Sequence, residues 1–230
     1  MLVSVDMEQI EFRLAVDVSG QEDFLEEIIR GRDPHILTAQ QFFNCKKPTD
    51  KQREVGKTGN YAGLYGAGVG KLVRACGLTF DEARGFLDWF YEKYDKVQTM
   101  IDEAHQFVEE HSFIISPYGR RRDFVIPDGD ADLLAAAQRE GLNHMFQSMG
   151  HDTLLVYWLL IRHHLGRECV LVTNEAHDEL ILDAPKKRLD NIKAICYNGF
   201  TMVAPEIKRR FGYQLRVPIT GQVKVGRSWP

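Results

Sequence analysis

The stretch "TNEAHDELILDAP", residues 173–185, places a polar cluster between two apolar runs, 170–172 and 180–182. Short apolar runs that flank a polar turn are typical of two β-strands joined in a hairpin. The turn carries two adjacent carboxylates, Asp178 and Glu179, beside His177. Neighbouring anions repel each other and a cation relieves the repulsion, so we expect a cation site that takes a further ligand from elsewhere in the chain.

Length and composition place the chain among globular proteins. Its 230 residues are enough for one large domain or two small ones, and 44% hydrophobic with 27% charged residues is an ordinary composition. The net charge of −4 argues against a protein that coats nucleic acid indiscriminately. It leaves open a local basic groove, for which the clusters at 118–123 and 186–190 are candidates.

Cysteine spacing and the N-terminus bear on location and on zinc. The 4 cysteines, Cys45, Cys76, Cys169 and Cys196, form no C-x-x-C pair, so we expect reduced thiols and no zinc knuckle. No apolar run is long enough to span a membrane, and the N-terminus lacks the pattern of a secretion signal. We therefore expect a cytoplasmic protein, in the host cytoplasm if the source is a virus, with no membrane partner.

The pattern along the chain predicts an α+β fold, with a small antiparallel sheet and many helices. Glycine, proline and capping residues set most of the expected boundaries. In the first part of the chain we expect a strand at 2–6, then helices at 9–18 (ended by Gly20), 23–30 and 33–43 (opened by Asp33-Pro34), and a loop at 44–50. Further on we expect a helix from the Thr79/Glu82 capping box through 94, another helix to 111, and a hairpin at 113–127. The last part should hold helical structure at 131–165 with a break near Gly150, a helix at 187–210 and a strand at 217–226.

Asp6, at the end of the first strand, is the best candidate for the missing ligand. Two carboxylates from separate strands suit a pair of Mg²⁺ ions, because this hard cation is usually held by few carboxylates together with phosphates and water. Two such ions can assist an in-line phosphoryl displacement. The alternative is that Asp6 caps the helix that follows and Asp178 only fills a turn.

Four residues spaced by four, Arg53, Lys57, Tyr61 and Tyr65, form a stripe along a predicted helix. Two cations followed by two phenols suit a ligand with a polyphosphate at one end and a flat ring at the other. The alternative is a solvated amphipathic helix.

Glycines interrupt the same segment, at Gly56, Gly59 and Gly63. Each costs about 1 kcal/mol in a helix interior relative to alanine. We therefore expect close approach of a substrate or of another backbone. Two apparent motifs here are rejected: position 51 is Lys51 where a Walker A loop needs glycine, and position 71 is Lys71 where the dinucleotide fingerprint needs glycine.

A third set of polar residues, Arg139, Asn143 and Gln147, is also spaced by four. Such a face offers donors for the acceptors of a nucleic-acid minor groove. The alternative is a polar face that contacts only solvent.

Together, these stretches resemble motifs A, B and C of the DNA polymerase I family (family A). Motif A resembles "DMEQIEFR" (6–13), motif B is similar to "REVGKTGNYAGLYG" (53–66), and motif C is "HDE" (177–179). The "YGRRR" segment and the Arg139/Asn143/Gln147 set stand in the family's order. The resemblance runs from residue 3 to the terminal "GRSWP".

The resemblance implies a polymerase palm, with a small antiparallel sheet and helices, and a helical fingers subdomain. It assigns 1–20 to the palm with motif A, 21–115 to the fingers with motif B, and 116–230 to the palm with the primer-template contacts and motif C. The implied function is template-directed DNA synthesis by a two-metal mechanism, with primer-template DNA and dNTP as partners.

The resemblance also implies roles for individual residues. Asp6 and Asp178 would hold two Mg²⁺ ions, or Mn²⁺ as a substitute, with help from the Met7 carbonyl, and Glu179 would be a nearby, less essential carboxylate. The residues that would bind the nucleotide are Gln9, Glu11, Arg53, Lys57, Tyr61 and Tyr65. Arg53 and Lys57 would grip the triphosphate, and Lys57 would protonate the pyrophosphate. Tyr61 would pack on the nucleotide, Tyr65 would stack near the templating position, and Glu11 with Tyr65 would reject a 2′-hydroxyl. Arg139, Asn143, Gln147 and His177 would contact primer and template.

Some positions depart from the family pattern. Tyr61 stands where many members carry phenylalanine, Ala62 stands where glycine is usual, and Met7-Glu8 replaces a common Tyr-Ser pair. A phenol at position 61 can supply a hydrogen bond that a dideoxynucleotide's missing 3′-hydroxyl no longer provides. We therefore expect weak discrimination against dideoxynucleotides.

A larger departure lies ahead of motif A, because the family's thumb, further palm strands and exonuclease-type domain have no counterpart in the sequence. We expect a split or truncated polymerase whose second polypeptide supplies the thumb and remaining palm, possibly with an exonuclease. Three alternatives stay open: a catalytically incompetent DNA-binding subunit or fragment, an enzyme like the single-subunit RNA polymerases, and a two-metal phosphodiesterase.

Overall fold

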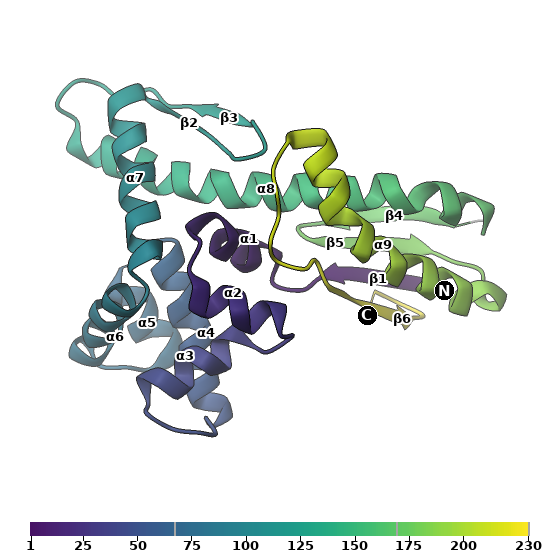
Figure 1. Cartoon of the computed structure of the whole chain (residues 1–230), viewed down its shortest axis with the longest axis horizontal. Helices are drawn as coiled ribbons and strands as arrows, with labels where there is room; N and C mark the ends of the chain where they lie inside the picture. The colour runs from purple at the N-terminus through teal and green to yellow at the C-terminus, as the bar shows by residue number, and fades with distance from the viewer. Residues whose placement is uncertain (67, 169, 230) are drawn as a thin grey trace. The chain divides into compact units, whose positions relative to one another are not determined.

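The computed structural model describes residues 1–66, 68–168 and 170–229, which excludes Cys169 among the cysteines considered above. Figure 1 shows the order of the elements along the chain. The strands are β1 (Leu2–Met7), β2 (Phe113–Ile115), β3 (Arg121–Asp123), β4 (Leu171–Ala176), β5 (Glu179–Asp183) and β6 (Gly221–Gly226). The helices are α1 (Ile10–Ser19), α2 (Glu22–Ile29), α3 (Pro34–Phe42), α4 (Asp50–Leu64), α5 (Val69–Cys76), α6 (Phe80–Lys93), α7 (Asp95–His111), α8 (Ala131–Arg167), the short 3₁₀ helix η1 (Lys186–Arg188) and α9 (Leu189–Phe211).

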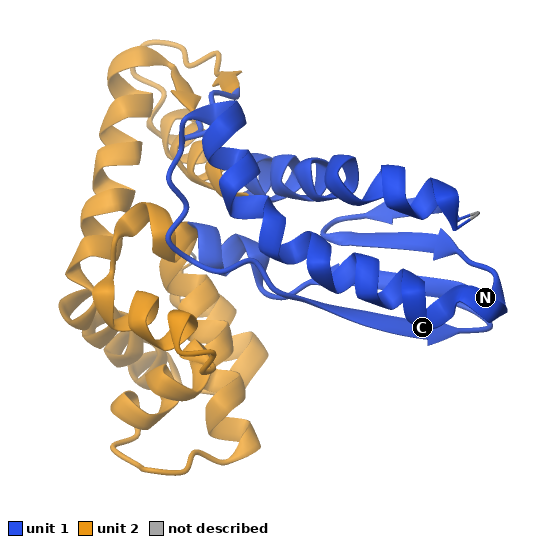
Figure 2. Ribbon diagram, turned by 45° about the vertical axis from the view of Figure 1, so that its right-hand side comes forward, with its two compact units in different colours: residues 1–14, 116–120, 147–230 blue, residues 15–115, 121–146 orange. Residues whose placement is uncertain are grey.

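The chain divides into two compact units, coloured separately in Figure 2. Unit 1 comprises Met1–Leu14, Ser116–Arg120 and Gln147–Pro230, and unit 2 comprises Ala15–Ile115 and Arg121–Phe146. Helices α1 and α8 contribute residues to both units. The palm and fingers boundaries given by the resemblance stay predictions.

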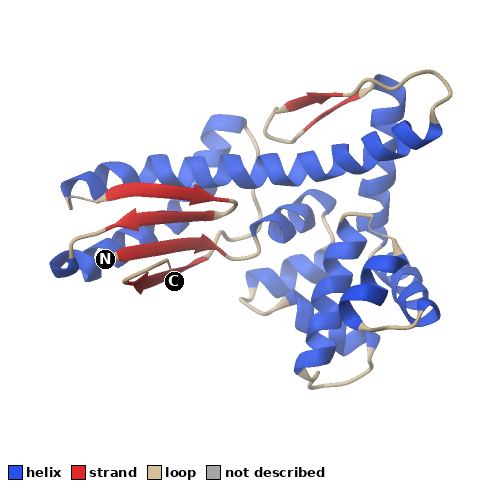
Figure 3. Ribbon diagram, turned by 180° about the vertical axis from the view of Figure 1, so that it is seen from behind, coloured by secondary structure: helices blue, strands red, loops and turns tan. Residues whose placement is uncertain are grey.

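Unit 1 is built on a four-stranded antiparallel sheet in the order β4-β5-β1-β6. Figure 3 shows the four strands from behind, with the helices of the unit beyond them. Val3 and Val5 on β1 are fully buried, while Ser4 and Asp6 point to the other face because side chains alternate along a strand. The sheet therefore presents Asp6 on the face opposite to this apolar core.

Helices α8 and α9 pack against each other in the core of unit 1. A Cβ added at Gly199 of α9 would lie 2.3 Å from Ile161 Cγ2 and 2.8 Å from Tyr157 Cε2 on α8, so only glycine fits there. The Tyr157 hydroxyl donates a hydrogen bond of 3.0 Å to the Cys196 carbonyl oxygen. Because the buried Tyr157 hydroxyl has no access to water, this bond to the Cys196 carbonyl supplies the hydrogen-bond acceptor that the hydroxyl needs.

The motif C hairpin predicted from the sequence is confirmed. β4 and β5 pair from Ala176↔Glu179 to Leu171↔Asp183, with a register shift between Val172 and Asn174. Only positions 177 and 178 form the turn, and His177 adopts a left-handed conformation with φ 57°. A two-residue turn forces tight reversal, which fixes the directions in which its side chains point.

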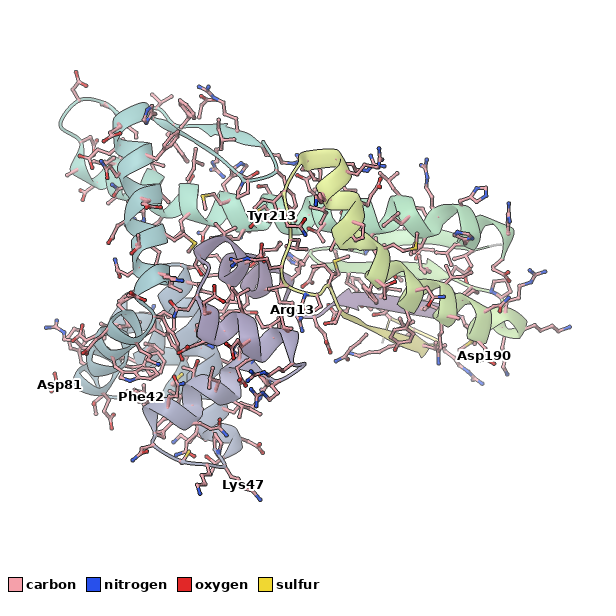
Figure 4. All side chains as sticks on the ribbon, viewed as in Figure 1. Arg13, Phe42, Lys47, Asp81, Asp190 and Tyr213 are labelled. Atoms are coloured by element: carbon pink, nitrogen blue, oxygen red, sulfur yellow. The ribbon has the colours of Figure 1, made fainter. Side chains whose placement is uncertain are left out.

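Unit 2 is mainly helical, and aromatic residues fill its core. The rings of Phe24 and Tyr94 lie 4.2 Å apart between centroids, and Phe86, Phe90 and Tyr94 are fully buried. Phe42, labelled in Figure 4, meets Phe86 edge-on at 4.7 Å. Large rings bury much apolar surface at little entropic cost, so they hold together the helices that flank α4.

The glycines of α4 allow two different close approaches. A Cβ at Gly56 would lie 2.5 Å from the His35 carbonyl oxygen of α3, which is the backbone approach expected from the sequence. A Cβ at Gly59 would lie 2.1 Å from the Phe86 ring, and one at Gly63 would lie 2.3 Å from the Phe90 ring. At these two positions the neighbour is an aromatic side chain of α6, so the expectation of a substrate or a backbone was wrong.

Capping residues lie at three helix boundaries that the sequence predicted, two where a helix begins and one where a helix ends. The Asp33 carboxylate accepts from the His35 N–H, with Pro34 at the first helical position, and Thr79 forms a capping box with Glu82. Gly20 follows α1 with φ 68°. The α+β class is confirmed as well, whereas α5 was not expected.

One prediction about α8 was wrong, because the helix runs from Ala131 to Arg167 without a break at Gly150. Gly150 is buried, and a Cβ there would make ordinary contact at 3.7 Å with Ile10 Cγ2. Met149 and Leu154 on either side are fully buried. Burial of such side chains contributes about 2 kcal/mol each, which outweighs the helix penalty of about 1 kcal/mol for one glycine.

Candidate active site

Three carboxylates meet where β1 ends and the motif C hairpin turns. Asp6 pairs with Glu179 across β1 and β5, and the Met7 N–H donates a 3.0 Å bond to the Asp178 carbonyl oxygen. Side chains of directly paired residues lie on the same face of a sheet, so Asp6 and Glu179 are neighbours on the face away from Val3 and Val5. Folding therefore joins residues that stand 172 positions apart in the sequence, from Asp6 to Asp178.

The charges in this cluster are costly in the absence of a cation. Burial raises the pKa of Asp6 above its ordinary value, and the Glu179 charge raises that pKa further, while Lys224 opposes the effect. Burial likewise raises the pKa of Asp178, and the Asp6 charge adds to the increase. Both carboxyls are thus harder to ionise than a solvated aspartate, as expected for groups that a bound cation would stabilise.

Glu179 is held by two donors, one to each carboxylate oxygen. The Ser4 hydroxyl donates to Oε1, and the Trp229 indole Nε1 donates to Oε2 at 3.0 Å. Trp229 belongs to the terminal "GRSWP" stretch, whose contact with motif C the sequence reasoning missed. Because both oxygens already accept hydrogen bonds, Glu179 is better suited to shape the anionic pocket than to ligate a cation directly.

The donor set fits magnesium better than zinc. Among the described residues, no group of three or more His, Cys, Asp and Glu side chains is arranged to hold a metal ion. Two carboxylates and one carbonyl form an all-oxygen set, which suits Mg²⁺ because that ion completes its shell with water and substrate phosphates. Asp6, Asp178 and the Met7 carbonyl are residues of this kind.

Glu8, which departs from the family pattern, forms hydrogen bonds that hold the local structure. Its carboxylate accepts from Thr220 Oγ1 at 3.1 Å and from Gln222 Nε2 at 2.8 Å. Arg13, labelled in Figure 4, donates Nε to the Glu8 carbonyl at 2.9 Å and Nη1 to the Pro218 carbonyl at 3.0 Å. These bonds tie the chain that follows Asp6 to β6 and the segment before it.

In unit 2, α4 presents the cationic and aromatic stripe. Thr49 forms a capping box with Gln52, so Arg53 lies in the first turns of the helix. Lys57 is exposed, and the Tyr61 and Tyr65 rings are nearly parallel, 7° apart with centroids at 6.3 Å. Arg53, Lys57 and Tyr61 therefore lie along α4, as the spacing indicated, and Tyr65 is the C-cap residue directly after it.

Two residues of α3's N-terminus contact this stripe, and the sequence reasoning gave neither a role in the site. Asp33 forms an ion pair with Arg53, and the His35 ring lies 5.7 Å from the Tyr61 ring. Burial lowers the pKa of His35 to about 4, and the Arg53 and Lys57 charges lower it against the opposing charge of Asp33. His35 is thus neutral at neutral pH. In the sequence, Asp33-Pro34 indicated a helix start, and this was the only feature that singled out Asp33 or His35.

The remaining predicted contacts lie on α8, in the motif C turn and at the start of α1. Arg139 and Gln147 are exposed on α8 and Asn143 is half-buried, so the set spaced by four is accessible. His177 is exposed in the turn. Gln9 has a left-handed φ of 53°, and a Cβ at Gly150 would lie 3.9 Å from Glu11 Cγ. Among the described residues, no helix is long and apolar enough to cross a membrane.

Comparison with known proteins gives a consistent result. A family model described as DNA polymerase family A matches residues 1–230. The thermostable DNA polymerase I of Thermus aquaticus is 27% identical over 100% of this chain, and DNA polymerase I of Chloroflexus aurantiacus is 29% identical over 99%. The chain spans only 27% and 24% of those two relatives.

A solved structure, the POL domain of Pol1 from M. smegmatis in complex with DNA primer-template and dNTP, resembles the fold with a TM-score of 0.84. The identity is 21%, and the match covers 99% of this chain and 40% of that one. The family resemblance drawn from the three motifs is confirmed by these comparisons: the chain belongs to DNA polymerase family A.

Proposed function

We propose that this chain carries the catalytic part of a DNA-directed DNA polymerase. In the proposed reaction, a primer 3′-hydroxyl attacks the α-phosphate of a dNTP selected by the template, and pyrophosphate leaves. The observation that supports this most directly is the meeting of Asp6 with the Asp178 turn, where both carboxyls have a raised pKa.

The donor set supports a two-metal mechanism. Asp6, Asp178 and the Met7 carbonyl would hold two Mg²⁺ ions, for which Mn²⁺ is a substitute. Bound ions of this kind activate the attacking oxygen and stabilise the departing one in an in-line displacement. Glu179 would keep the pocket anionic through its fixed position beside Asp6.

The residues of α4 would bind the incoming nucleotide. Arg53 and Lys57 would hold the triphosphate, and Lys57 would give a proton to the departing pyrophosphate. Tyr61 would pack on the sugar and base, and Tyr65 would stack near the templating position. In unit 1, Gln9 and Glu11 would contact the nucleotide, and Glu11 would disfavour a 2′-hydroxyl because its carboxylate would clash with that group or be left unpaired.

Primer and template would contact the polar set on α8 and the motif C turn. Arg139, Asn143 and Gln147 can donate to minor-groove acceptors, which are nearly the same for all base pairs. This suits an enzyme that must copy any sequence. His177, next to Asp178 in the sequence, would make a further contact with primer or template.

The main alternative is a DNA-binding chain without catalysis. The anionic cluster argues against this alternative. The carboxylates of Asp6 and Asp178 already resist ionisation, and grouped negative charges repel a polyanion such as DNA, so the cluster has no use in DNA binding alone. A two-metal phosphodiesterase would need further free carboxylates, whereas Glu179 already accepts from Ser4 and Trp229.

Primer extension tests the proposal. The purified chain, alone and with any protein that co-purifies, would be given a primed template, dNTPs and Mg²⁺. We expect Asp178→Asn to reduce extension at least about a thousandfold, since it removes a metal-binding charge from the transition state. Extension that survives this substitution would overturn the proposed chemistry.

Asp190→Asn is the matched control. Asp190 is an exposed aspartate of unit 1 in the first turn of α9, labelled in Figure 4. Extension by this variant should equal that of the wild type. DNA binding, measured by fluorescence anisotropy, should persist in Asp178→Asn, and if it is lost as well the substitution has damaged more than the chemistry.

A further inference from the structure

The Asp33 carboxylate joins α3 to α4 through its two oxygens. Oδ1 accepts from the His35 backbone N–H at 2.8 Å and so caps α3. Oδ2 accepts from Arg53 Nε at 2.8 Å and from Arg53 Nη2 at 2.5 Å. The Asp33 side chain thus both caps α3 and binds Arg53, and only the cap could be expected from the Asp-Pro sequence.

Both ends of this ion pair are fixed by their helices. The first turn of α3 is set by Asp33 and Pro34, and the start of α4 is set by the Thr49 capping box. Gly56 brings the two helices into backbone contact one turn after Arg53. Arg53 is therefore held between rigid elements, which distinguishes it from an exposed ion pair between two mobile side chains.

The geometry leaves part of the guanidinium available. Arginine carries five N–H donors in a planar fork, and Asp33 takes one from Nε and one from Nη2. The other three point away from the carboxylate in the same plane. The Arg53 side chain is 37% exposed and that of Asp33 is 23% exposed, so the arginine is the more accessible partner of the pair.

We propose that Asp33 is a positioning residue that fixes the plane of the Arg53 guanidinium so that its remaining donors bind the triphosphate of the nucleotide. This rests on the proposed function, which makes Arg53 a triphosphate ligand. A long side chain loses rotational freedom when it binds, and an arginine already held by a carboxylate loses less. Asp33 thus raises affinity for the triphosphate without touching it.

Two effects of the Asp33 charge oppose each other. Its negative charge reduces the field that attracts the triphosphate, while its two hydrogen bonds order the guanidinium. Lys57 has an exposed side chain in the same stripe and supplies attraction that Asp33 does not neutralise by contact. We therefore expect the ordering effect to dominate, so that removal of the carboxylate weakens binding.

A double-mutant cycle on the purified full chain tests this, with inorganic tripolyphosphate as the probe and calorimetry as the readout. Asp33→Asn keeps an oxygen acceptor for the α3 cap and removes the charge. We expect it to weaken tripolyphosphate binding about tenfold, the effect of losing a charge-assisted contact that orients a ligand. Arg53→Ala should weaken binding at least as much, and Asp33→Asn should have no further effect in the Arg53→Ala background.

Thr79→Ala controls for stability, because it removes a helix cap of α6 in the same unit, and that cap is made with Glu82 and not with Arg53. Its tripolyphosphate affinity should match that of the wild type. Additive effects of Asp33→Asn and Arg53→Ala, tighter binding by Asp33→Asn, or no binding by the wild type would each overturn the inference.

Primer extension separates this inference from the proposed function. In a chain that extends primers, Asp33→Asn should raise KM for dNTP about tenfold and leave kcat nearly unchanged. If the wild type binds tripolyphosphate with the expected coupling but does not extend primers, the proposed function fails and the Asp33–Arg53 coupling stands. If it extends primers without that coupling, only the inference fails.

Discussion

Asp6 of β1 lies directly opposite Glu179 of β5, so two carboxylates face each other across adjacent antiparallel strands. Like charges in directly paired positions destabilise a sheet. The Asp178 turn adds a third carboxylate to the same strand ends. Such an arrangement stores unfavourable electrostatic energy in the folded state, and that energy is available to favour cation binding.

The first prediction concerns the stability of the anionic cluster. Asp178→Asn should raise the free energy of unfolding by about 1 kcal/mol at pH 7 in EDTA, a typical gain for removing a strained functional charge. The Asp178 pKa is raised in the folded state, so its ionised form destabilises the fold above that pKa. The advantage of the variant should therefore vanish as the pH falls below about 4, where an ordinary aspartate is protonated.

Thermal denaturation with and without Mg²⁺ checks this. Added Mg²⁺ should raise the Tm of the wild type, because a ligand that binds only the folded state stabilises it. It should have little effect on Asp178→Asn. A variant less stable than the wild type in EDTA would contradict the idea of stored repulsion.

The second prediction concerns Trp229. Trp229→Phe removes the indole donor to Glu179 Oε2, and should lower the free energy of unfolding by about 1 kcal/mol, the net value of one hydrogen bond. Glu179→Gln weakens the same bond but also removes the repulsion from Asp6, so its own effect on the free energy of unfolding combines a loss and a gain. In chemical denaturation, the double variant should therefore be more stable, by about 1 kcal/mol, than the sum of the two single effects predicts. Additive effects would show that the bond contributes nothing.

The third prediction concerns pH. The His35 pKa is lowered to about 4 in the folded state, chiefly by burial, while an unfolded histidine titrates near 6.5. Above pH 6.5 the ring is neutral in both states and costs nothing, and the free energy of unfolding falls as the pH drops from 6.5 toward 4, because the unfolded state then binds the proton more readily. Between pH 7 and 5 the wild type should lose about 2 kcal/mol more than His35→Gln. Parallel urea titrations at both pH values measure this, and equal losses would exclude His35 as the cause.

The fourth prediction uses two glycines with opposite surroundings. A Cβ at Gly59 would fall 2.1 Å from the Phe86 ring, so Gly59→Ala should destabilise the protein by about 3 kcal/mol through overpacking. No atom of the described residues lies within 4 Å of a Cβ at Gly85, a helical position of α6, so Gly85→Ala should stabilise by about 0.5–1 kcal/mol. Calorimetric Tm values would show the opposite shifts, and shifts of the same sign would refute the packing argument.

The fifth prediction concerns Tyr61, whose ring lies near the rings of both His35 and Tyr65. A phenol there can replace the hydrogen bond that a dideoxynucleotide lacks, so the wild type should discriminate weakly. Tyr61→Phe should increase discrimination, as the ratio of kcat/KM for dNTP and ddNTP, about tenfold or more. Strong discrimination by the wild type that Tyr61→Phe leaves unchanged would refute this role.

Much of the local structure could be predicted from neighbouring residues. The Asp33-Pro34 start of α3, the Thr79/Glu82 capping box and the motif C hairpin depend on interactions within a few positions, which the sequence shows directly. α5 was not expected, because glycines on both sides of its eight residues resemble a loop. The break expected near Gly150 was wrong because packing outweighs helix propensity there.

In the candidate site, too, some features could be predicted from the sequence and others could not. The sequence could indicate Asp6, Asp178 and the α4 stripe, since each belongs to a motif with its own spacing. It could not indicate that Trp229 donates to Glu179 or that Asp33 holds Arg53, because both pairs join segments whose separation in the sequence carries no periodic signal.

Caps, turns and motif spacing act over short distances, so the sequence was enough to indicate most of the helices, the hairpin, the family and the residue types available for chemistry. It was not enough to indicate α5, the unbroken course of α8, or which side chains interact electrostatically or by hydrogen bonds, because these depend on packing between segments. The pairing of β1 with β5 set Asp6 against Glu179, and the packing of α3 on α4 set Asp33 against Arg53. Electrostatic energy depends on distance in space, and distance along a folded chain does not fix it.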